Sequence, residues 1–427
     1  MKLRIVGRTP LMVLLLLLVI ASGCRRNDER LPGGDRPTVA PAEEAFVPRL
    51  TRVGDPGVNY TNVEFSADGR FMVWFEMTDR AGNGIVWHCE VDPETGDFIP
   101  PDGRGFRAFE STVLGRANPG LDAAGAYYVG MDRAGRLLLV RPTGPSSGDT
   151  RVLATPPDAT RRAIYPTVLP GYVGGYVFWI KNEAVPGGGN NPGNSWFELQ
   201  YISLDNPARI NVVERQQRPA RGFAPMDSAF ARWMKNKPAL TYGSADDRGV
   251  VQVRMLDLTR PDAEPEMVTD DPGNKVDPYS WFHEGREILL AGVDGQARTH
   301  VYVREPGEAV FHVAEIIVPP ASGLARPALA QSNEPIVYGG HAYTTYQVND
   351  AGSGFYDVTF GRAGEIWLAT LFESPQRQWL LTDSTAAKAE PEPYVGRSRV
   401  WVFYNVVEGN DLVTARWHLY RAETPIR

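Results

Sequence analysis

The chain has little cysteine and no excess of positive charge. Its 427 residues include two cysteines, Cys24 and Cys89, which excludes a framework of several disulfides. Acidic residues outnumber basic ones by 51 to 44, the two signs are well mixed, and the formal net charge is -7. Because proteins that bind duplex nucleic acid carry a basic stripe or patch, a nucleic-acid partner is excluded.

The chain also has no apolar run of membrane length, and its longest apolar run lies near its start. That run covers residues 11–20, after a basic start with Lys2, Arg4 and Arg8, and it is followed by the small residues of the segment ASGC at 21–24. These are the three parts of a secretory signal peptide. Ten apolar residues are too few for a membrane-spanning helix, which needs about 20.

The segment that ends at Cys24 resembles the lipobox of bacterial lipoproteins, with Ala21 where leucine is commonest. The resemblance implies cleavage before Cys24 and membrane attachment through acyl chains on this cysteine, which together give stable anchoring. An ordinary signal peptide with a chance cysteine is the alternative. Arg25 and Arg26 replace the aspartate associated with inner-membrane retention in enteric bacteria. The resemblance therefore favours the outer membrane of the cell envelope, with the protein facing the periplasm or the cell surface.

Composition divides the chain into three parts. Residues 1–23 form the predicted lipoprotein signal peptide. Residues 24–45 are rich in Pro, Gly and charge and almost without large apolar groups, which predicts a lipidated disordered tether. A flexible coil of about 20 residues reaches roughly 25 Å. Residues 46–427 are then the folded domain.

The predicted domain is all-β. No convincing helical pattern of any length occurs, 43 Gly and 35 Pro interrupt the chain, and short apolar or alternating runs fill the gaps. One very apolar strand recurs seven times, and such continuous runs indicate burial on both faces. The copies lie at residues 71–75, 126–129, 176–180, 239–242, 288–291, 336–338 and 400–404. Cys89 lies in an alternating run and is predicted to be a small buried residue.

These repeats predict a seven-bladed β-propeller. The last unit ends soon after its third strand, and residues 46–53 look like an orphan fourth strand, so we expect the N-terminal strand to complete the last blade and close the ring. A six-bladed ring is the alternative if the fourth copy, around Ala239, is not a true repeat.

The segment FSADGR at residues 65–70, followed by an apolar strand, resembles the repeat of TolB-like, WD-repeat-like β-propellers, with Ala67 in place of the usual proline. Looser copies start at Trp281 and Leu121. The pair Asp68-Gly69 suits a two-residue hairpin turn with positive φ values. The motif is therefore structural and implies no catalysis.

Recognisable catalytic motifs are missing from the sequence. There is no GxSxG nucleophile elbow and no phosphate-binding P-loop. No two of the six histidines have a metal-binding spacing, although a cluster assembled from different blades stays open. No catalytic residue, metal or cofactor is therefore predicted.

Carboxylates at blade starts are the alternative source of chemistry, because glycosidases on five-bladed propellers use Asp and Glu at the centre of one face. Candidates are Asp55, Asp227, Asp277 and Glu392. A turn or capping role is favoured for each. The pair Asp270-Asp271 runs into Pro272-Gly273, which favours a solvated turn over a calcium site.

Two kinds of surface are predicted to bind a ligand. The first consists of long loops, which are often functional: residues 185–196 in the third unit, and an insertion from His341 through Tyr356 that contains Tyr343 and Tyr346. Exposed aromatic rings there could stack on sugars or anchor proteins, or cover their own blade edge. The second is one mouth of the central channel, predicted to be lined by Asn59, Tyr60, Asn118, Tyr165, Asp277, Tyr279 and Tyr394.

Three functions fit this sequence. The leading hypothesis is an envelope-anchored lipoprotein whose propeller is a non-enzymatic binding or scaffold module for a protein or glycan partner. The runner-up is a carbohydrate-active enzyme, a glycoside hydrolase or lyase, that uses carboxylates at the channel mouth. A structural component of a surface layer or assembly is the third.

Overall fold

The computed structural model describes residues 47–427 except 80–81, 100–103, 113–114, 116, 158–160, 181–194, 218–224, 261, 295–297, 321–322, 325–326, 351–361 and 410–414. The predicted signal peptide, Cys24 and most of the tether lie outside this part. The described residues form antiparallel sheets and one short helix, α2 (Pro225–Ser228). The all-β prediction is confirmed.

Seven sheets, named sheets 1 to 7 in chain order, make up the described domain. Sheet 1 contains β2 (Tyr60–Phe65), β3 (Phe71–Met77), β4 (Asn83–Glu90) and β5 (Phe106–Thr112). Sheet 2 contains β6 (Asn118–Asp122), β7 (Gly125–Met131), β8 (Leu137–Gly144) and β9 (Ser147–Ala154). Sheet 3 contains β10 (Arg161–Leu169), β11 (Tyr172–Ile180), β12 (Ser195–Ser203) and β13 (Asn206–Gln217). Sheet 4 contains β14 (Arg232–Trp233), β15 (Ala239–Ala245), β16 (Val251–Asp257) and β17 (Glu266–Met267).

The remaining sheets follow the same order. Sheet 5 contains β18 (Lys275–His283), β19 (Arg286–Val293), β20 (Thr299–Arg304) and β21 (His312–Ile317). Sheet 6 contains β22 (Pro327–Ser332), β23 (Ile336–Tyr338), β24 (His341–Asp350), β25 (Gly364–Leu371) and β26 (Gln378–Leu380). Sheet 7 contains β27 (Ala387–Val395), β28 (Val400–Glu408), β29 (Arg416–Glu423) and β1 (Leu50–Arg52).

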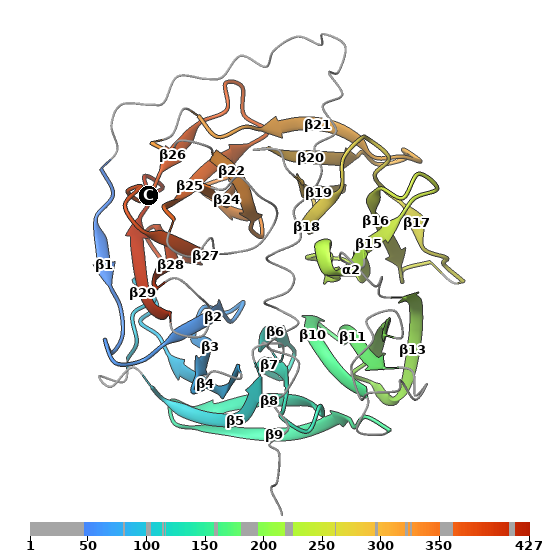
Figure 1. The fold of residues 1–427 in the computed structure, drawn as a ribbon, viewed down its shortest axis with the longest axis horizontal. Coiled ribbons are helices and arrows are strands. Elements are labelled where there is room, and N and C mark those ends of the chain that lie inside the picture. Colours follow the sequence, from blue (N-terminus) through green and yellow to red (C-terminus); the bar gives the residue numbers. More distant parts are fainter. Residues whose placement is uncertain are drawn as a thin grey trace, which may run out of the picture.

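The sheets stand around a common centre (Figure 1). Their first strands contact one another in turn, from β27 to β2, β6, β10, β14, β18 and β22, so these strands surround the centre of the ring. At the outer edge of sheet 7, β1 pairs antiparallel with β29. The predicted closure by the N-terminal strand is confirmed, and the fourth repeat around Ala239 is a complete four-stranded sheet.

The second strands are the apolar runs that the repeat predicted. Residues Phe71 to Phe75 of β3 are at most 4% exposed, and β19 is equally buried between Ile288 and Ala291. Each such strand packs against side chains of neighbouring sheets on both faces, as clusters that join sheets 1 and 7 or sheets 5 and 6 show. The buried Cys89 belongs to the cluster between sheets 1 and 7, which confirms its prediction as a small core residue.

The hairpin between β2 and β3 differs from the prediction. Gly69 has a positive φ of 66°, and its N–H donates to the carbonyl oxygen of Ser66 over 2.8 Å, while the Ser66 N–H donates to the carbonyl oxygen of Phe71. The loop therefore has four residues around a β-turn with one left-handed glycine, and the predicted two-residue turn is wrong. The Asp68 carboxylate accepts from the Ser66 hydroxyl over 2.6 Å, which confirms a structural role for the motif.

Sheet 6 also corrects the sequence prediction. The run at residues 336–338 is β23, an additional short strand that pairs with β24. The second strand of sheet 6 is β24 itself, which was predicted to be part of an inserted loop. Its pattern misled because buried polar side chains, including Thr345 and Gln347, alternate with aromatic ones.

The first strands carry a repeated irregularity. β2, β10, β18 and β27 each contain a β-bulge, and one bulge residue in each strand has a positive φ: Asn62, Tyr165, Asp277 and Glu390. Bulges redirect the side chains of a strand and are common beside functional sites. These bulges lie in the first strands, which surround the centre of the ring.

Candidate functional site

Polar side chains from four sheets meet at the centre of the ring. We name this set the central cluster: Glu64 of sheet 1, Arg232 of sheet 4, Asp277 and Tyr279 of sheet 5, and Glu392 of sheet 7. The charges of all the other four members act on the Tyr279 phenol, which shows that the set converges on one place. Asp277 is itself a bulge residue. Glu64, Tyr279 and Glu392 each lie two residues after the bulge residue of their strand.

The Arg232 guanidinium connects two members of the cluster. Its Nη2 donates to Asp277 Oδ1 over 2.7 Å, and its Cζ lies 3.9 Å from the centroid of the Tyr279 ring. The Asp277 side chain is 5% exposed and that of Arg232 is 22% exposed. A buried charge is tolerated when it is paired in this way, and stacking on an aromatic face adds to the stabilisation. Two residues of sheet 5 therefore fix the guanidinium of Arg232, which belongs to sheet 4, at the ring centre.

Glu392 is the member of the cluster whose proton affinity is raised by its surroundings. Burial raises its pKa well above the usual value, and the nearby Glu64 carboxylate raises it further. A hydrogen bond from Asn333 Nδ2 to Glu392 Oε2, 3.1 Å long, and the charge of Arg232 act in the opposite direction. A carboxyl group whose pKa is raised in this way holds its proton more tightly than a carboxyl group in water.

The cluster is also accessible from solvent. Glu64, Arg232, Tyr279 and Glu392 are all of intermediate exposure rather than fully buried. Together they offer a guanidinium, a phenol and carboxyl oxygens, a set that can hydrogen-bond hydroxyl or amine groups of a ligand. Such a convergence of polar groups with perturbed pKa values is typical of binding and catalytic sites.

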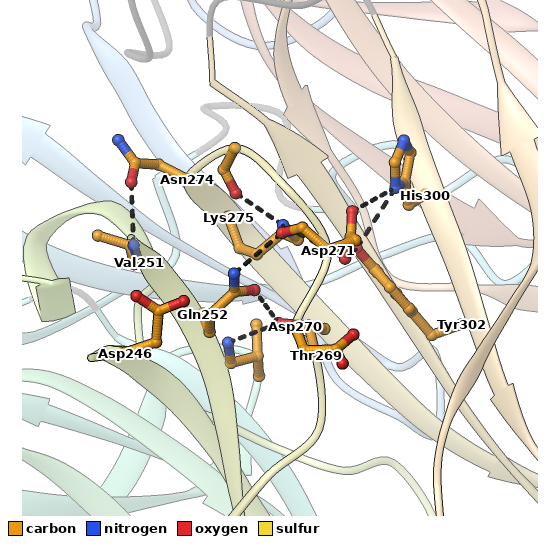
Figure 2. Close-up of polar contacts among 12 residues, drawn as sticks. Asp246, Val251, Gln252, Thr269, Asp270, Asp271, Asn274, Lys275, His300 and Tyr302 are labelled. Atoms are coloured by element: carbon orange, nitrogen blue, oxygen red, sulfur yellow. Dashed lines mark hydrogen bonds and ion pairs between the residues drawn. The ribbon is translucent and has the colours of Figure 1, made fainter. Parts of the chain in front are cut away.

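The pair Asp270-Asp271 matches the predicted solvated turn in part: Asp270 is exposed, whereas the Asp271 carboxylate belongs to a hydrogen-bonded network. Figure 2 shows Asp271 between Lys275 on one side and His300 and Tyr302 on the other. Tyr302 donates to Asp271 Oδ1 over 2.6 Å, and His300 Nδ1 lies 3.1 Å from Oδ2. Burial raises the pKa of Asp271, but the contacts with His300 and Tyr302 and the charge of Lys275 outweigh it and hold the pKa at about 2.

Two residues predicted at the channel mouth belong to the core instead. Tyr60 is 1% exposed, stacks on Phe98, and accepts a hydrogen bond from the Asp55 N–H over 3.0 Å. Tyr394 is 2% exposed and donates to the carbonyl oxygen of Gly69 over 3.0 Å. Both rings fill the cluster between sheets 1 and 7, so neither meets a ligand at the centre.

Three further predicted mouth residues contact other parts of the protein. Asn59 accepts from the N–H of Trp417 over 3.2 Å, and Asn118 accepts from the N–H of Val168 over 3.3 Å, so both amides hold neighbouring backbone. Tyr165 lies at a bulge and its ring packs 4.8 Å from that of Phe230. Of the predicted mouth residues, Asp277 and Tyr279 are the two that the structure brings into the central cluster.

The prediction of a ligand-binding insertion in the sixth unit is wrong for residues 341–350, which form β24. Tyr343 and Tyr346 lie on β24 and are 5% and 1% exposed, because β24 is the buried second strand of sheet 6. Tyr356 lies outside the described residues. The long loop of the third unit does connect two paired strands, since Ile180 pairs with Ser195, but residues 181–194 are likewise outside the described part.

The remaining blade-start carboxylates divide by role. Asp55 accepts from the N–H of Gly57 over 2.7 Å, which is the turn role predicted for it. Asp227 lies on α2. Glu392 is the member of this group that enters the central cluster with Asp277.

Glu64, Arg232 and Asn333 were missed at the sequence level. A signal for part of the cluster exists in the sequence: residues 269–279 read TDDPGNKVDPY and residues 382–392 read TDSTAAKAEPE. Aligning these segments places Tyr279 and Glu392 at the same position of their strands. Arg232 offers no such signal because its strand has two residues.

A metal centre is not formed by the described residues, where no three His, Cys, Asp or Glu side chains are grouped to hold an ion. Among the same residues, no helix has the length and hydrophobicity needed to cross a membrane.

Comparisons with known proteins support the fold. No protein-family model matches the sequence, and no curated protein sequence matches it. The structure is similar to an oligogalacturonate lyase in complex with manganese, with a TM-score of 0.52, 11% identity, and coverage of 88% of this chain and 93% of that chain. This likeness shows a propeller-type fold and does not extend to activity.

Two of the other similar structures have lower scores. A Trypanosoma rangeli sialidase matches with a TM-score of 0.45 and 11% identity over 87% of this chain and 59% of that chain. TolB from Acinetobacter baumannii matches with a TM-score of 0.39 and 12% identity over 76% of this chain and 66% of that chain. These scores carry no argument about function. A propeller-type fold serves binding modules and enzymes alike, so the fold does not decide between the two.

Proposed function

We propose that this chain is an envelope-anchored lipoprotein with a seven-bladed propeller that binds a protein or glycan partner at the central cluster. The observation that carries the proposal is the convergence of Glu64, Arg232, Asp277, Tyr279 and Glu392 from four sheets onto one accessible place. Structural stability alone gives little reason to collect carboxyl groups there, because burying charge is costly. Ligand binding explains the position of these carboxyl groups better than stability does.

The lipid anchor rests on the segment that ends at Cys24. Acylation there would hold the propeller at a membrane, and the closure by β1 would join the tether to the outer edge of sheet 7. Mass spectrometry of the mature protein tests this directly. A diacylglyceryl-modified Cys24 at the N-terminus is expected, and an unmodified Cys24 would remove the anchoring part of the proposal.

Binding is tested with the full-length protein in lipid nanodiscs, using a glycan array and crosslinked envelope extracts. Asp277→Asn and Glu392→Gln keep the side-chain shape but remove an ionisable carboxyl group, and each is expected to weaken binding of the recovered partner at least tenfold. Glu284→Gln is the matched control, because the Glu284 side chain is 69% exposed in the β18–β19 hairpin. Equal affinity in the central variants and the control would contradict the site.

A carbohydrate-active enzyme is the second candidate, favoured by the electrostatic coupling between Glu392 and Glu64. A protonated Glu392 could donate a proton to a glycosidic oxygen while an ionised carboxylate assists from the other side. The same glycans are therefore incubated with the wild-type protein and with Glu392→Gln. Turnover that disappears in the variant supports the enzyme, whereas binding without turnover supports the binding module.

A further inference from the structure

A groove of about 570 Å³ lies between sheets 3 and 4, away from the central cluster. Sheet 3 contributes Tyr172 at the start of β11, Tyr201 near the end of β12, and Asn211 of β13. Sheet 4 contributes Leu258 and Arg260, which follow β16. The lining therefore sits where the strands of both sheets turn, and its volume is in the range of small-molecule sites.

Two aromatic rings form one wall of this groove, and the core holds them in place. The rings of Tyr172 and Tyr201 lie 5.3 Å and 6.0 Å from the ring of Trp233, measured between centroids. Trp233 is 6% exposed, and its indole N–H donates to the carbonyl oxygen of Thr167 over 3.2 Å. The two tyrosines keep partial exposure on this fixed support. A ligand that stacks on them meets a preorganised surface and orders little of the protein.

The polar lining has balanced charge. The charged lining residues are Arg209, Arg260, Asp262 and Glu264, so the lining has no net charge. Arg260 is also engaged with carboxylates of its own sheet, at 3.5 Å from Asp257 and 3.4 Å from Glu266. The groove therefore does not favour a strongly charged ligand.

We propose that this groove binds a neutral oligosaccharide, with sugar rings stacked on Tyr172 and Tyr201 and hydroxyl groups hydrogen-bonded by Asn206, Asn211 and Arg209. Pyranose rings present an apolar face and a polar edge, and the groove offers the matching pair of surfaces. An extended peptide would also find aromatic contacts, but a rim without net charge that carries the amides of Asn206 and Asn211 fits hydroxyl groups better. The proposal does not depend on the function of the central cluster.

The test uses full-length protein in nanodiscs, which avoids detergents with sugar head groups. Calorimetric titrations use maltohexaose, cellohexaose and N-acetylchitohexaose as neutral probes, with oligogalacturonate and a pool of neutral peptides for comparison. Saturable binding of at least one neutral hexasaccharide is expected, at least tenfold weaker in Tyr201→Ala. Because Tyr201→Ala also removes packing on Trp233, Asn206→Trp is the second variant: Asn206 is exposed, and the indole is expected to block the groove.

Val310→Ala is the control, because Val310 is 71% exposed and lies outside the groove lining. It should bind the sugar like the wild type. Three results would overturn the proposal: binding of the acidic sugar or the peptides alone, no binding of any neutral probe, or wild-type affinity in both Tyr201→Ala and Asn206→Trp. The effect of Asp277→Asn on partner binding tests the central cluster separately. A failure of the groove proposal is therefore distinguished from a failure of the central cluster.

Discussion

Lys275 and Lys388 occupy equivalent positions in two copies of one sequence pattern, and both are buried beside an aspartate. Lys275 Nζ donates to the carbonyl oxygen of Gly273 over 2.7 Å and lies 3.4 Å from Asp271 Oδ1. Lys388 Nζ donates to the carbonyl oxygen of Gly364 over 3.1 Å and lies 2.9 Å from Asp383 Oδ1. Each ammonium fixes the segment that leads into a bulged first strand, and so positions the acidic residue two places further on.

Lys275→Met should destabilise the protein by about 3 kcal/mol, because the Asp271 carboxylate and two main-chain oxygens lose their buried cation. The change in the free energy of unfolding is measured by chemical denaturation. Lys235→Met is the matched control: the Lys235 side chain is 39% exposed and its pair with Glu334 is worth less than about 1 kcal/mol. A similar loss in both variants would contradict the role of Lys275.

His88 should make stability depend on pH below neutrality. It is 0% exposed, with Nδ1 2.8 Å from the Tyr128 hydroxyl oxygen and Nε2 3.2 Å from the Ser147 carbonyl oxygen, and burial lowers its pKa from 6.5 to about 4. The unfolded chain therefore binds a proton between these pH values while the folded chain does not. The stability present above pH 6.5 falls by about 3 kcal/mol by pH 4.

His88→Gln keeps a hydrogen-bonding side chain that does not titrate. Denaturation at several pH values should show the wild type losing stability relative to this variant from pH 6.5 to pH 4. Parallel profiles over that range would show that His88 does not cause the effect.

Glu392 should behave in the opposite way. Burial and the Glu64 carboxylate raise the pKa of Glu392, so the folded state holds the proton more tightly than the unfolded state. The contribution of Glu392 to the free energy of unfolding is therefore greatest at low pH and decreases as the pH rises above the usual pKa of Glu. Glu392→Gln is therefore expected to gain stability relative to the wild type between pH 4 and pH 8, as seen by thermal melts. A pH-independent difference, as expected for Glu284→Gln, would contradict the raised pKa.

Ring closure is tested with proline in β1. Val53 N–H donates to the Leu419 carbonyl oxygen and Glu423 N–H donates to the Arg49 carbonyl oxygen, so alternate residues, including Thr51, face β29 with their main-chain groups. Thr51→Pro removes a ladder hydrogen bond and should lower stability by about 1–3 kcal/mol. Leu50→Pro, at the position whose N–H faces away, should cost clearly less. Equal melting temperatures for the two variants would show that β1 does not close the ring.

Much of the fold could be predicted because burial leaves a visible pattern. The continuous apolar runs of β3 and β19 mark second strands, and the orphan strand at residues 46–53 indicates closure. β24 escaped because it buries the polar residues Thr344, Thr345 and Gln347, so a buried strand reads as a polar loop. The Thr344 hydroxyl donates to the Asn333 carbonyl oxygen, and the Gln347 amide donates to the Lys388 carbonyl oxygen of sheet 7.

The site was harder to predict. Asp277, Tyr279 and Glu392 are predicted from their places at blade starts and reach the cluster. Tyr60, two residues before the bulge residue Asn62, and Tyr394, four residues after the bulge residue Glu390, turn into the core. A β-bulge decides which side chain faces the centre, and a one-residue difference in register reverses the outcome. Arg232 and Glu64 meet because the ring brings sheets 1 and 4 across from one another, and no local pattern contains that information.

Site-specific photo-crosslinking tests the central claim, ligand binding at the ring centre, most directly. A photoreactive phenylalanine analogue replaces Tyr279 in the full-length protein, and the same analogue at Val310, which is 71% exposed outside the cluster, is the control. Irradiation of intact envelopes should give a defined adduct from position 279 that is absent from position 310 and is lost when Asp277→Asn is added. The same adduct from both positions, or an adduct at position 279 that persists in the double variant, would contradict binding at the central cluster.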